Sequence, residues 1–580
     1  NEILEAITNI FHIKEDDVIC CKCGSIRLKP GVFPEQINQK IPALLPKYID
    51  VERERKQGFD MELYIKPVSE IYTQSTEVKR MVVIMSVLAF ALLFVAAMNY
   101  ILNSVSSLPI RARSVGVHKC NGASSKDIFN MFLFETAALF VVALVCMALL
   151  LFAFREYVAD MAAVPTLGTL LNAQTIWLPA IMILAIFILS ALLPARLFSV
   201  IPVTQVFRVS TSGKQGWKRS LLFIQFGGIA FVITLLVIVL LQYDRLMNND
   251  LGYDPENIVY APLNNMDDQK AAKLTAEFKK LPYVTATGLS SMDILSGYGG
   301  FPILDNEKNW LFTARQVNYD ADYLSLMKIP LLEGQPLKGD GDILVNESFV
   351  SKRGWTDAAI GKYIYDDEGN LKGKIVGVTR DFMVNSFFTP QLPVIMFGSD
   401  RMSYCNFTVR VSELTPEYLR EMNDKIAELF PNEDVGFTVL KTIIESQYEG
   451  TRHFRDGVFV ASIAILLITL MGLLGYITDE MHRRSKEIAI RKVNGATAPN
   501  ILRLLSKDVL ITAFPAILLG VIASRVVGES WLRQFADKIP LTVFIFISTA
   551  LLVLAIIWGC VILKSWNIAN ENPVRSIKNE

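Results

Sequence analysis

The stretch that decides the fold occurs twice, as RARSVGVHKCNGAS at residues 111–124 and as RSKEIAIRKVNGAT at residues 484–497. The two copies align without a gap at a constant offset, and each lies between two hydrophobic segments. Similarity at a fixed spacing is the signature of a repeated architecture. We therefore predict two homologous membrane halves, each with an equivalent basic loop.

The composition is that of a membrane protein. Of the 580 residues, 52% are hydrophobic, and the formal net charge is zero. A soluble chain of this length is usually less apolar. A neutral chain also lacks the excess positive charge that points to a nucleic-acid partner. The seven cysteines and four histidines are too scattered for a disulfide framework or a histidine-rich metal site.

Seven windows are long and apolar enough to cross a bilayer, which needs about 20 residues. They lie at about 81–103, 132–154, 174–196, 220–243, 455–477, 508–530 and 541–563. Lys and Arg are concentrated in the loops 104–131, 197–219 and 478–507, whereas the loops 155–173 and 531–540 are poorer in them. By the positive-inside rule, the basic loops and the C-terminus are cytoplasmic. The first 75 residues and the segment 244–452 are then expected outside.

The repeat predicts an α-helical polytopic membrane protein with α+β extracytoplasmic domains. Each half is expected to hold one span, an external domain and three more spans, and the first span is absent from this chain. We therefore expect the natural protein to carry one more N-terminal span and most of a first external domain. The alternative is a genuine seven-span protein with a small N-terminal region outside. The predicted segments are 1–75 (C-terminal part of the first external domain), 76–219 (three spans), 220–243 (the span opening the second half), 244–452 (second external domain) and 453–580 (three spans).

The segment 244–452 has the pattern of a soluble α+β domain. Strands are expected at 257–263, 283–289, 406–411 and 437–440. One helix is expected to begin at Asp267 or Asp268, and another at Thr415 as N-cap with Pro416 in first position. Two βαβ units enclosing a long insertion predict a split ferredoxin-like subdomain with a second subdomain inserted. The N-terminal piece is expected to repeat the last unit, with strands near 25–28 and 60–66 and a helix near 34–47.

Each basic loop is predicted to form a helix, a sharp corner and a second helix. Asn-Gly favours a helix end because both residues tolerate the left-handed conformation. Ser124 with Asp127 fits a capping box for the next helix, and Thr497 with Asn500 fits a weaker one. Such a corner would project a rigid basic knuckle towards an acidic protein groove or anionic lipid headgroups. The alternative is an ordinary loop whose charges only set the topology.

The second copy also carries a family resemblance. The passage KEIAIRKVNGAT at 486–497 resembles the hallmark of FtsX-like permeases, the membrane subunits of MacB-type ABC transporters. The segment 244–452 resembles the MacB-type periplasmic core in Val-Asn-Glu at 345–347 with Ile-Gly-Lys at 360–362, and in Ile-Val-Gly-Val at 375–378 with Asp-Phe at 381–382. Asn-Pro-Val at 572–574 also fits. The first copy departs from the pattern, because Ser114 and His118 stand where the second has Glu487 and Arg491.

The resemblance implies that the loops around 111–127 and 484–500 are coupling segments that dock on a cytoplasmic ABC ATPase. A chain with both halves would form the whole pseudo-symmetric permease and bind two ATPase copies. The coupling residues implied are Arg111, Arg113, Lys119, Asn121, Gly122, Ala123, Arg484, Lys486, Glu487, Arg491, Lys492, Asn494, Gly495, Ala496 and Thr497. If the two contacts differ in strength, we expect 484–497 to be the stronger.

The resemblance further implies a multi-pass permease of the cytoplasmic membrane that works by mechanotransmission. ATP hydrolysis by the separate subunit would change the separation of the periplasmic domains. The expected work is export of peptides, drugs or other amphiphiles, with a periplasmic adaptor and an outer-membrane duct as candidate partners besides membrane lipid. Related permeases release lipoproteins from the membrane or activate a cell-wall hydrolase without transport, and both functions stay open as alternatives.

The sequence holds no phosphate-binding loop of the form GxxxxGK[ST]. We therefore expect the chain to be no enzyme and to bind no cofactor, with ATP and Mg held by the partner ATPase. An ion-coupled carrier is the alternative from a different class. Such carriers usually need charges within their spans, and the centres of these spans hold almost none.

Two minor features complete the set of candidate sites. Glu135 and Asp508 are equivalent in the repeat and lie at the cytoplasmic edge of a span. We interpret them as interfacial acids facing water, the alternative being contact with nearby basic residues. The cluster Cys20, Cys21 and Cys23 lacks the further ligands of a four-ligand zinc site, so no metal site is predicted.

Overall fold

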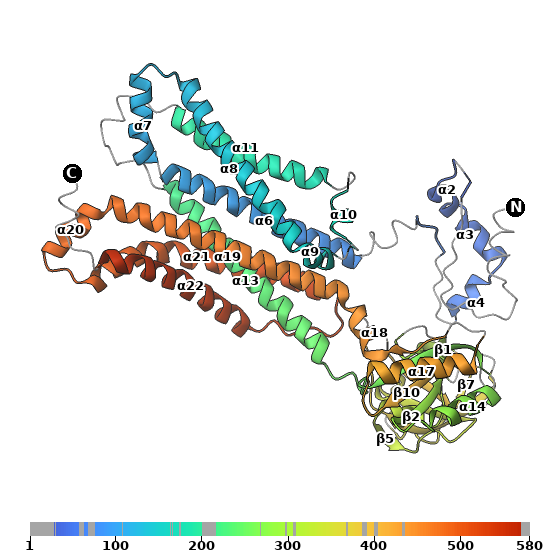
Figure 1. Ribbon diagram of the computed structural model, residues 1–580. Helices are drawn as coiled ribbons and strands as arrows, with labels where there is room; N and C mark the ends of the chain where they lie inside the picture. The colour runs from blue at the N-terminus through green and yellow to red at the C-terminus, as the bar shows by residue number, and fades with distance from the viewer. Residues whose placement is uncertain are drawn as a thin grey trace. The chain divides into compact units, whose positions relative to one another are not determined.

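The computed structural model describes most of the chain (Figure 1). Two compact units emerge and are described separately. One comprises Asn1–Ser75, Leu246–Tyr448 and Phe535–Asp537, and the other Thr76–Arg245, Glu449–Gln534 and Lys538–Glu580. The described residues are 28–29, 31–56, 63–67, 76–106, 108–162, 164, 166–172, 176–199, 216–266, 268–295, 299–305, 309–355, 357–366, 369–384, 391–398, 404–431 and 435–569.

The second unit is a bundle of long apolar helices. Its described helices are α6 (Thr76–Ser106), α7 (Leu108–Cys120), α8 (Ser125–Ala153), α9 (Arg155–Met161), α10 (Leu167–Leu170), α11 (Trp177–Ser199), α13 (Gly216–Asn248), α19 (Glu449–Arg483), α20 (Ser485–Val493), α21 (Ala498–Leu532) and α22 (Val543–Ala569). By length and composition, six of these could cross a membrane: α6, α8, α13, α19, α21 and α22. The window predicted at 174–196 falls on α11, whose apolar stretch Pro179–Leu192 is shorter.

The helices repeat as the sequence does. Helices α6 and α19 begin at residues 76 and 449, and helices α8 and α21 begin at 125 and 498, both pairs at the offset of the basic loops. In each half the packing is the same, because α8 and α6 contact α11 while α21 and α19 contact α22. The predicted fold class, a polytopic helical membrane protein with α+β extracytoplasmic domains, is confirmed.

The two halves meet along α6 and α19. Asn99 of α6 and Gly472 of α19 are repeat equivalents and face each other there. The Asn99 side-chain nitrogen donates to the Ile468 carbonyl at 2.8 Å, and a Cβ on Gly472 would stand 2.7 Å from the Asn99 side-chain oxygen. The glycine at 472 therefore leaves room between the helices for the Asn99 amide of the other half.

The first unit holds a mixed sheet that begins as a ferredoxin-like fold. The ferredoxin-like part has four strands: β1 (Ile258–Met266), β2 (Val284–Ser290), β10 (Tyr404–Val411) and β11 (Thr438–Val439). They lie in the order β11-β1-β10-β2, and neighbouring strands are antiparallel. Helices α14 (Asp268–Phe278) and α17 (Pro416–Leu429) connect them, and Thr415 caps α17 through its hydroxyl, as predicted. Phe278, Phe407 and Phe437 pack together in their core.

The predicted insertion between the two βαβ units extends the same sheet. It contributes β3 (Gly299–Leu304), β4 (Trp310–Tyr319), β5 (Leu331–Gly334), β6 (Asp342–Asn346), β7 (Tyr363–Tyr365), β8 (Leu371–Thr379) and β9 (Val394–Gly398), with helices α15 (Tyr323–Met327) and α16 (Glu347–Arg353). It has a core of its own, around Phe312, Phe349 and Ile375. One pair, Ser290 with Tyr319, joins β2 to β4, so the two subdomains share a sheet but not a core.

The N-terminal piece differs from the prediction where the structure describes it. Instead of one helix over 34–47 it forms α2 (Pro34–Asn38), α3 (Ile41–Leu44) and a 3-10 turn (Leu45–Lys47), followed by α4 (Val51–Lys56). Pro42 and Pro46 each sit in a first turn, because proline has no N–H for a continuing helix. Residues 63–67 form no strand; Ile65 bonds through its backbone to the Asn38 side chain. The strand predicted at 25–28 lies largely outside the described residues.

Candidate functional site: two helix corners and a clamp

The two basic loops form the same helix corner. In the first, the Ala123 N–H donates to the His118 carbonyl and the Gly122 N–H to the Lys119 carbonyl, at 3.0 and 3.1 Å. In the second, the corresponding bonds run from Ala496 to Arg491 and from Gly495 to Lys492, at 2.9 and 3.0 Å. This pair of bonds defines a Schellman motif, which requires a left-handed residue after the helix.

Glycine supplies that residue in both copies. Gly122 has φ +94° and Gly495 has φ +89°, and an added Cβ would meet nothing within 4 Å at either position. Backbone conformation alone therefore explains the glycine, since L-residues pay a steric cost at positive φ. The predicted helix–corner–helix is confirmed in both copies.

The helices that follow the corners start differently. Ser124 and Asp127 form the predicted capping box, in which the Ser124 hydroxyl accepts from the Asp127 N–H and the Asp127 carboxylate accepts from the Ser124 N–H. Thr497 takes the N-cap conformation but makes no side-chain cap bond, and Asn500 contacts it only through the backbone. The weaker capping box predicted for Thr497 and Asn500 is therefore wrong. Pro499 in the first turn already fixes the helix start.

The basic residues of the corners have distinct surroundings. The Lys119 ammonium donates to the Ser199 carbonyl at the end of α11, at 2.9 Å. Arg491 pairs with Glu487 one turn earlier, at 2.7 Å on an exposed face. Lys492 and Asn494 lie on the same helix end, and the side chains of Arg111, Arg113 and Lys486 are not among those described.

Arg484 is the most enclosed of these residues. Its guanidinium contacts the carboxylates of Glu480 on α19 and Asp508 on α21. Asp508 also lies 3.6 Å from Arg219 at the start of α13, and the neighbouring Lys218 pairs with Asp479 at 2.6 Å. Ion pairs therefore link α13, α19 and α21 next to the second corner.

The expectation that Asp508 faces water is therefore wrong, because it is half-buried against two arginines. Glu135, its equivalent, is exposed. Glu480, Asp479 and Lys218 were not singled out from the sequence. Glu480 and Arg484 are four residues apart at the end of a span, and this spacing is the local pattern that indicates an ion pair along a helix.

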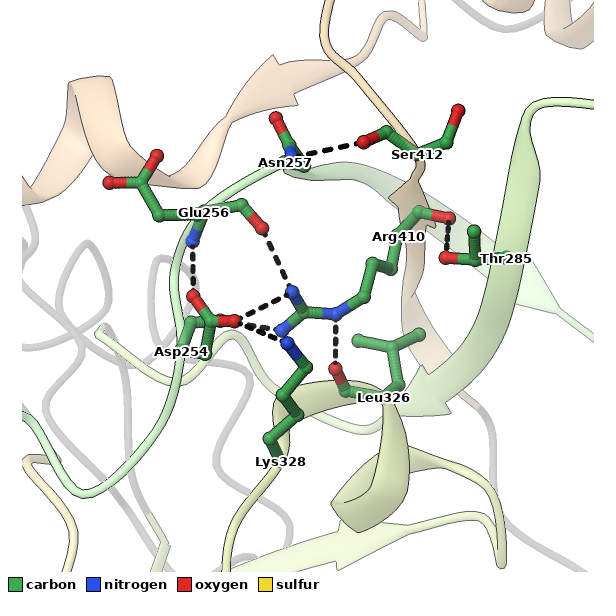
Figure 2. Close-up of polar contacts among 8 residues, drawn as sticks. All are labelled: Asp254, Glu256, Asn257, Thr285, Leu326, Lys328, Arg410 and Ser412. Carbon is green, nitrogen blue, oxygen red and sulfur yellow. Dashed lines mark hydrogen bonds and ion pairs between the residues drawn. The ribbon is translucent and has the colours of Figure 1, made fainter.

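A second polar site lies in the external domain, next to the residues by which the chain enters it from α13 (Figure 2). Arg410 on β10 donates through Nε to the Leu326 carbonyl at 2.7 Å and through its two terminal nitrogens to Asp254 and to the Glu256 carbonyl. The Lys328 ammonium reaches the same Asp254 carboxylate at 2.7 Å. We call Arg410, Asp254 and Lys328 the clamp.

The clamp fixes the connector between α13 and β1. The pKa of Asp254 is lowered: burial alone would raise it, but Lys328, Arg410 and the Glu256 N–H outweigh that burial. Glu256 in turn pairs with Lys441 of α18 (Leu440–Gln447) at 2.6 Å. Helix α18 leads directly into α19. Both connectors to the membrane helices are therefore tied to one strand of the sheet.

Other candidate chemistry finds no support in the described part of the chain. No group of three or more His, Cys, Asp or Glu side chains there could hold a metal ion. Cys20, Cys21 and Cys23 lie outside the described residues.

Comparison with known proteins gives the family. The FtsX-like permease C-terminal domain matches twice, at residues 86–203 and 459–573, and the two matches start at the repeat offset. No curated protein matches the chain.

Solved structures resemble parts of it. The periplasmic region of MacB from Actinobacillus actinomycetemcomitans shows 13% identity and TM-score 0.26, over 35% of this chain and 97% of that one. A domain of a permease protein from Porphyromonas gingivalis shows 13% and 0.25, over 32% and 90%. The extracellular domain of the noncanonic ABC-type transporter YknZ from Gram-positive bacteria shows 11% and 0.24, over 32% and 99%.

The repeated corner therefore lies, in both copies, inside a segment that matches the same permease domain. The chain carries two copies of the FtsX-like permease C-terminal domain.

Proposed function

We propose that this chain is the permease subunit of an ABC transporter and that each corner receives one copy of a cytoplasmic ATPase. The observation that carries the proposal is the duplicated corner, with the same Schellman bonds in both copies. A docking element for a symmetric pair of ATPases must itself occur twice in the same geometry. The corner at 111–124 and the corner at 484–497 meet that requirement.

The charged contacts around Arg484 support a mechanical role. When the ATPase pair closes, the two corners approach each other and displace the helices attached to them. The second corner is joined through Glu480 and Asp508 to α19 and α21, and through Arg219 to α13. Helices packed and paired in this way move as a body, because cores and interfaces change between discrete arrangements.

The clamp supports transfer of that motion to the outside. Helix α13 enters the external domain at Asp254 and Glu256, and α18 leaves it beside Lys441. Arg410 holds the connector between α13 and β1 to the sheet. The Glu256–Lys441 pair then holds α18 to that connector. A pull on either helix would therefore act on the whole domain instead of unravelling a loop.

In this proposal, the transporter exports peptides, drugs or other amphiphiles. ATP and Mg are bound by the ATPase, and the C-terminus lies with the corners in the cytoplasm. A periplasmic adaptor and an outer-membrane duct would complete an export path. The runs of exposed apolar residues along α8, such as Phe134, Leu139 and Val141, are suited to contact with lipid.

The test replaces the corner glycines. Valine at Gly122 and Gly495 disfavours positive φ, and alanine at Gly450, which lies in a helix with open space around it, is the matched control. We expect the double corner variant to lose retention of the ATPase and transport, while the control keeps both. Unchanged ATPase association and transport in the corner variant, and in a variant with Lys492 replaced, would contradict the role.

A further inference from the structure

The outer face of α20 presents two exposed apolar side chains flanked by a partial polar ring. Ile488 and Ala489 are buried against the bundle, but Ile490 is 61% exposed and Val493, three residues later on the same face, is 68% exposed. Glu487 lies three residues before Ile490 and Asn494 four residues after it, so both share its face. Both are exposed, as is Arg491.

The first corner repeats this arrangement with different side chains. Val115 is fully buried and Val117, the equivalent of Ile490, is 53% exposed. Ser114, His118 and Asn121 are exposed around it. The apolar centre is therefore present in both copies although the ring around it has changed.

We propose that Ile490 and Val117 are the anchors of the two docking points, each filling an apolar pocket on the ATPase subunit. This inference rests on the proposed function and deepens it. Protein interfaces concentrate their binding energy in a few enclosed side chains, and the surrounding polar contacts exclude water. An exposed aliphatic residue flanked by exposed polar groups, as Ile490 is by Glu487 and Asn494, fits that anatomy.

The polar ring identifies the occupant as protein and not lipid. Faces of this bundle suited to lipid are apolar over several turns, as at Leu139, Val142 and Leu149 of α8. The outer face of α20 instead places Glu487 and Arg491 beside Ile490. Burial of that ion pair in hydrocarbon would be unfavourable, whereas at the rim of a protein interface it stays hydrated.

The two docking points carry the same charge. Residues 484–497 hold four basic residues and Glu487, and residues 111–124 hold three basic residues and no acid, so both come to three positive charges with neutral histidine. Ser114 and His118 stand where the second copy has a bonded pair, so the first copy lacks both partners of that pair. The replacement changes the ring and leaves the electrostatic attraction equal.

The anchors themselves differ by one methylene. Isoleucine buries one CH₂ more than valine, which corresponds to about fourfold in affinity. The second docking point is therefore the stronger, in the direction expected for 484–497.

The first test is photocrosslinking in the membrane of the natural host with the full-length protein. A benzophenone amino acid is placed at Ile490, at Val117 and, as controls, at Phe134 and Val526, which are 73% and 66% exposed on the bundle. We expect crosslinked peptides from a subunit with a nucleotide-binding loop at Ile490 and Val117 only. Lipid adducts at Ile490 and Val117, without ATPase peptides, would overturn the proposal.

The second test uses Ile490→Asp and Val117→Asp, separately and together, with Leu371→Asp as the control at an aliphatic residue of the external domain that is 56% exposed. ATPase retained on the purified permease should fall at least tenfold in the double variant, more for Ile490→Asp than for Val117→Asp, and should stay unchanged for Leu371→Asp. Unchanged thermal unfolding of each variant shows that the fold is intact, as expected for exposed positions.

The two tests separate this inference from the proposed function. If no ATPase is retained even by the unaltered protein, the proposed function fails. If the unaltered protein and the double variant retain it equally, the function stands and the anchors are wrong.

Discussion

The clamp at Arg410 allows a quantitative prediction. Replacing Arg410 by Met keeps most of the side-chain volume but removes four hydrogen bonds, one of them to a carboxylate. The carbonyls of Leu326, Asp254 and Glu256 lose their donor, while the Asp254 carboxylate keeps Lys328 at 2.7 Å. Because the guanidinium is almost fully buried, the loss is about 3 kcal/mol, below the full cost of an unpaired buried charge.

For a domain of this size that loss lowers the midpoint of thermal unfolding by about 6–12 °C. Arg410→Lys keeps the charge but cannot fork to several acceptors, so it should lose about half as much. Lys328→Gln removes only an exposed pair and should cost less than about 1 kcal/mol. Thermal unfolding of the full-length protein gives the midpoints, and hydrogen exchange of the β1 and β10 amides localises the change. A midpoint for Arg410→Met within 2 °C of the unaltered protein would refute the role given to the clamp.

Three further changes are predicted. Burial raises the pKa of Asp320 from 3.8 to about 6; the folded protein then binds more protons than the unfolded chain between about pH 4 and pH 6, so stability falls as pH rises through that window. Asp320→Asn should therefore increase the free energy of unfolding at pH 7.5 by at most about 3 kcal/mol, seen as a higher midpoint of thermal unfolding. The difference from the unaltered protein should vanish by pH 4. Gly472→Ala places a Cβ 2.7 Å from the Asn99 side-chain oxygen and should cost about 1–3 kcal/mol by overpacking, seen as a lower midpoint for the membrane bundle. Ser124→Ala removes a helix cap that contributes about 1 kcal/mol, so hydrogen exchange at the start of α8 should become faster. Thr497→Ala should change exchange at the start of α21 much less, because Thr497 makes no side-chain cap bond. Equal effects of the two substitutions would contradict this asymmetry.

The sequence-based predictions succeeded where the determining pattern is local. The Asn-Gly corners, the Ser124–Asp127 box and the Thr415-Pro416 helix start depend on residues within a few positions of one another, and the structure has all three. The ferredoxin-like order followed from two βαβ units, because short connections and strand pairing leave few topologies.

The predictions failed where distant residues decide. Arg410 bonds to groups 84 and 156 positions away in the chain, and nothing near it in the sequence marks it. The ion pairs of Asp508 depend on Arg484 and Arg219, which three different helices bring together with it. The helix expected over 34–47 is divided for a local reason, because Pro42 and Pro46 lack the N–H that a continuing helix needs.

The most direct test of the proposed coupling is the distance between the two corners in different nucleotide states. Spin labels are attached to cysteines introduced at Asn121 and Asn494, both exposed at their corners, in a full-length protein whose native cysteines are replaced by serine. Pulsed electron paramagnetic resonance is recorded on the complex with its ATPase, without nucleotide and with ATP trapped. The coupling proposed here predicts a shorter distance with ATP trapped. The same distance distribution in both states, on a complex that hydrolyses ATP, would contradict it.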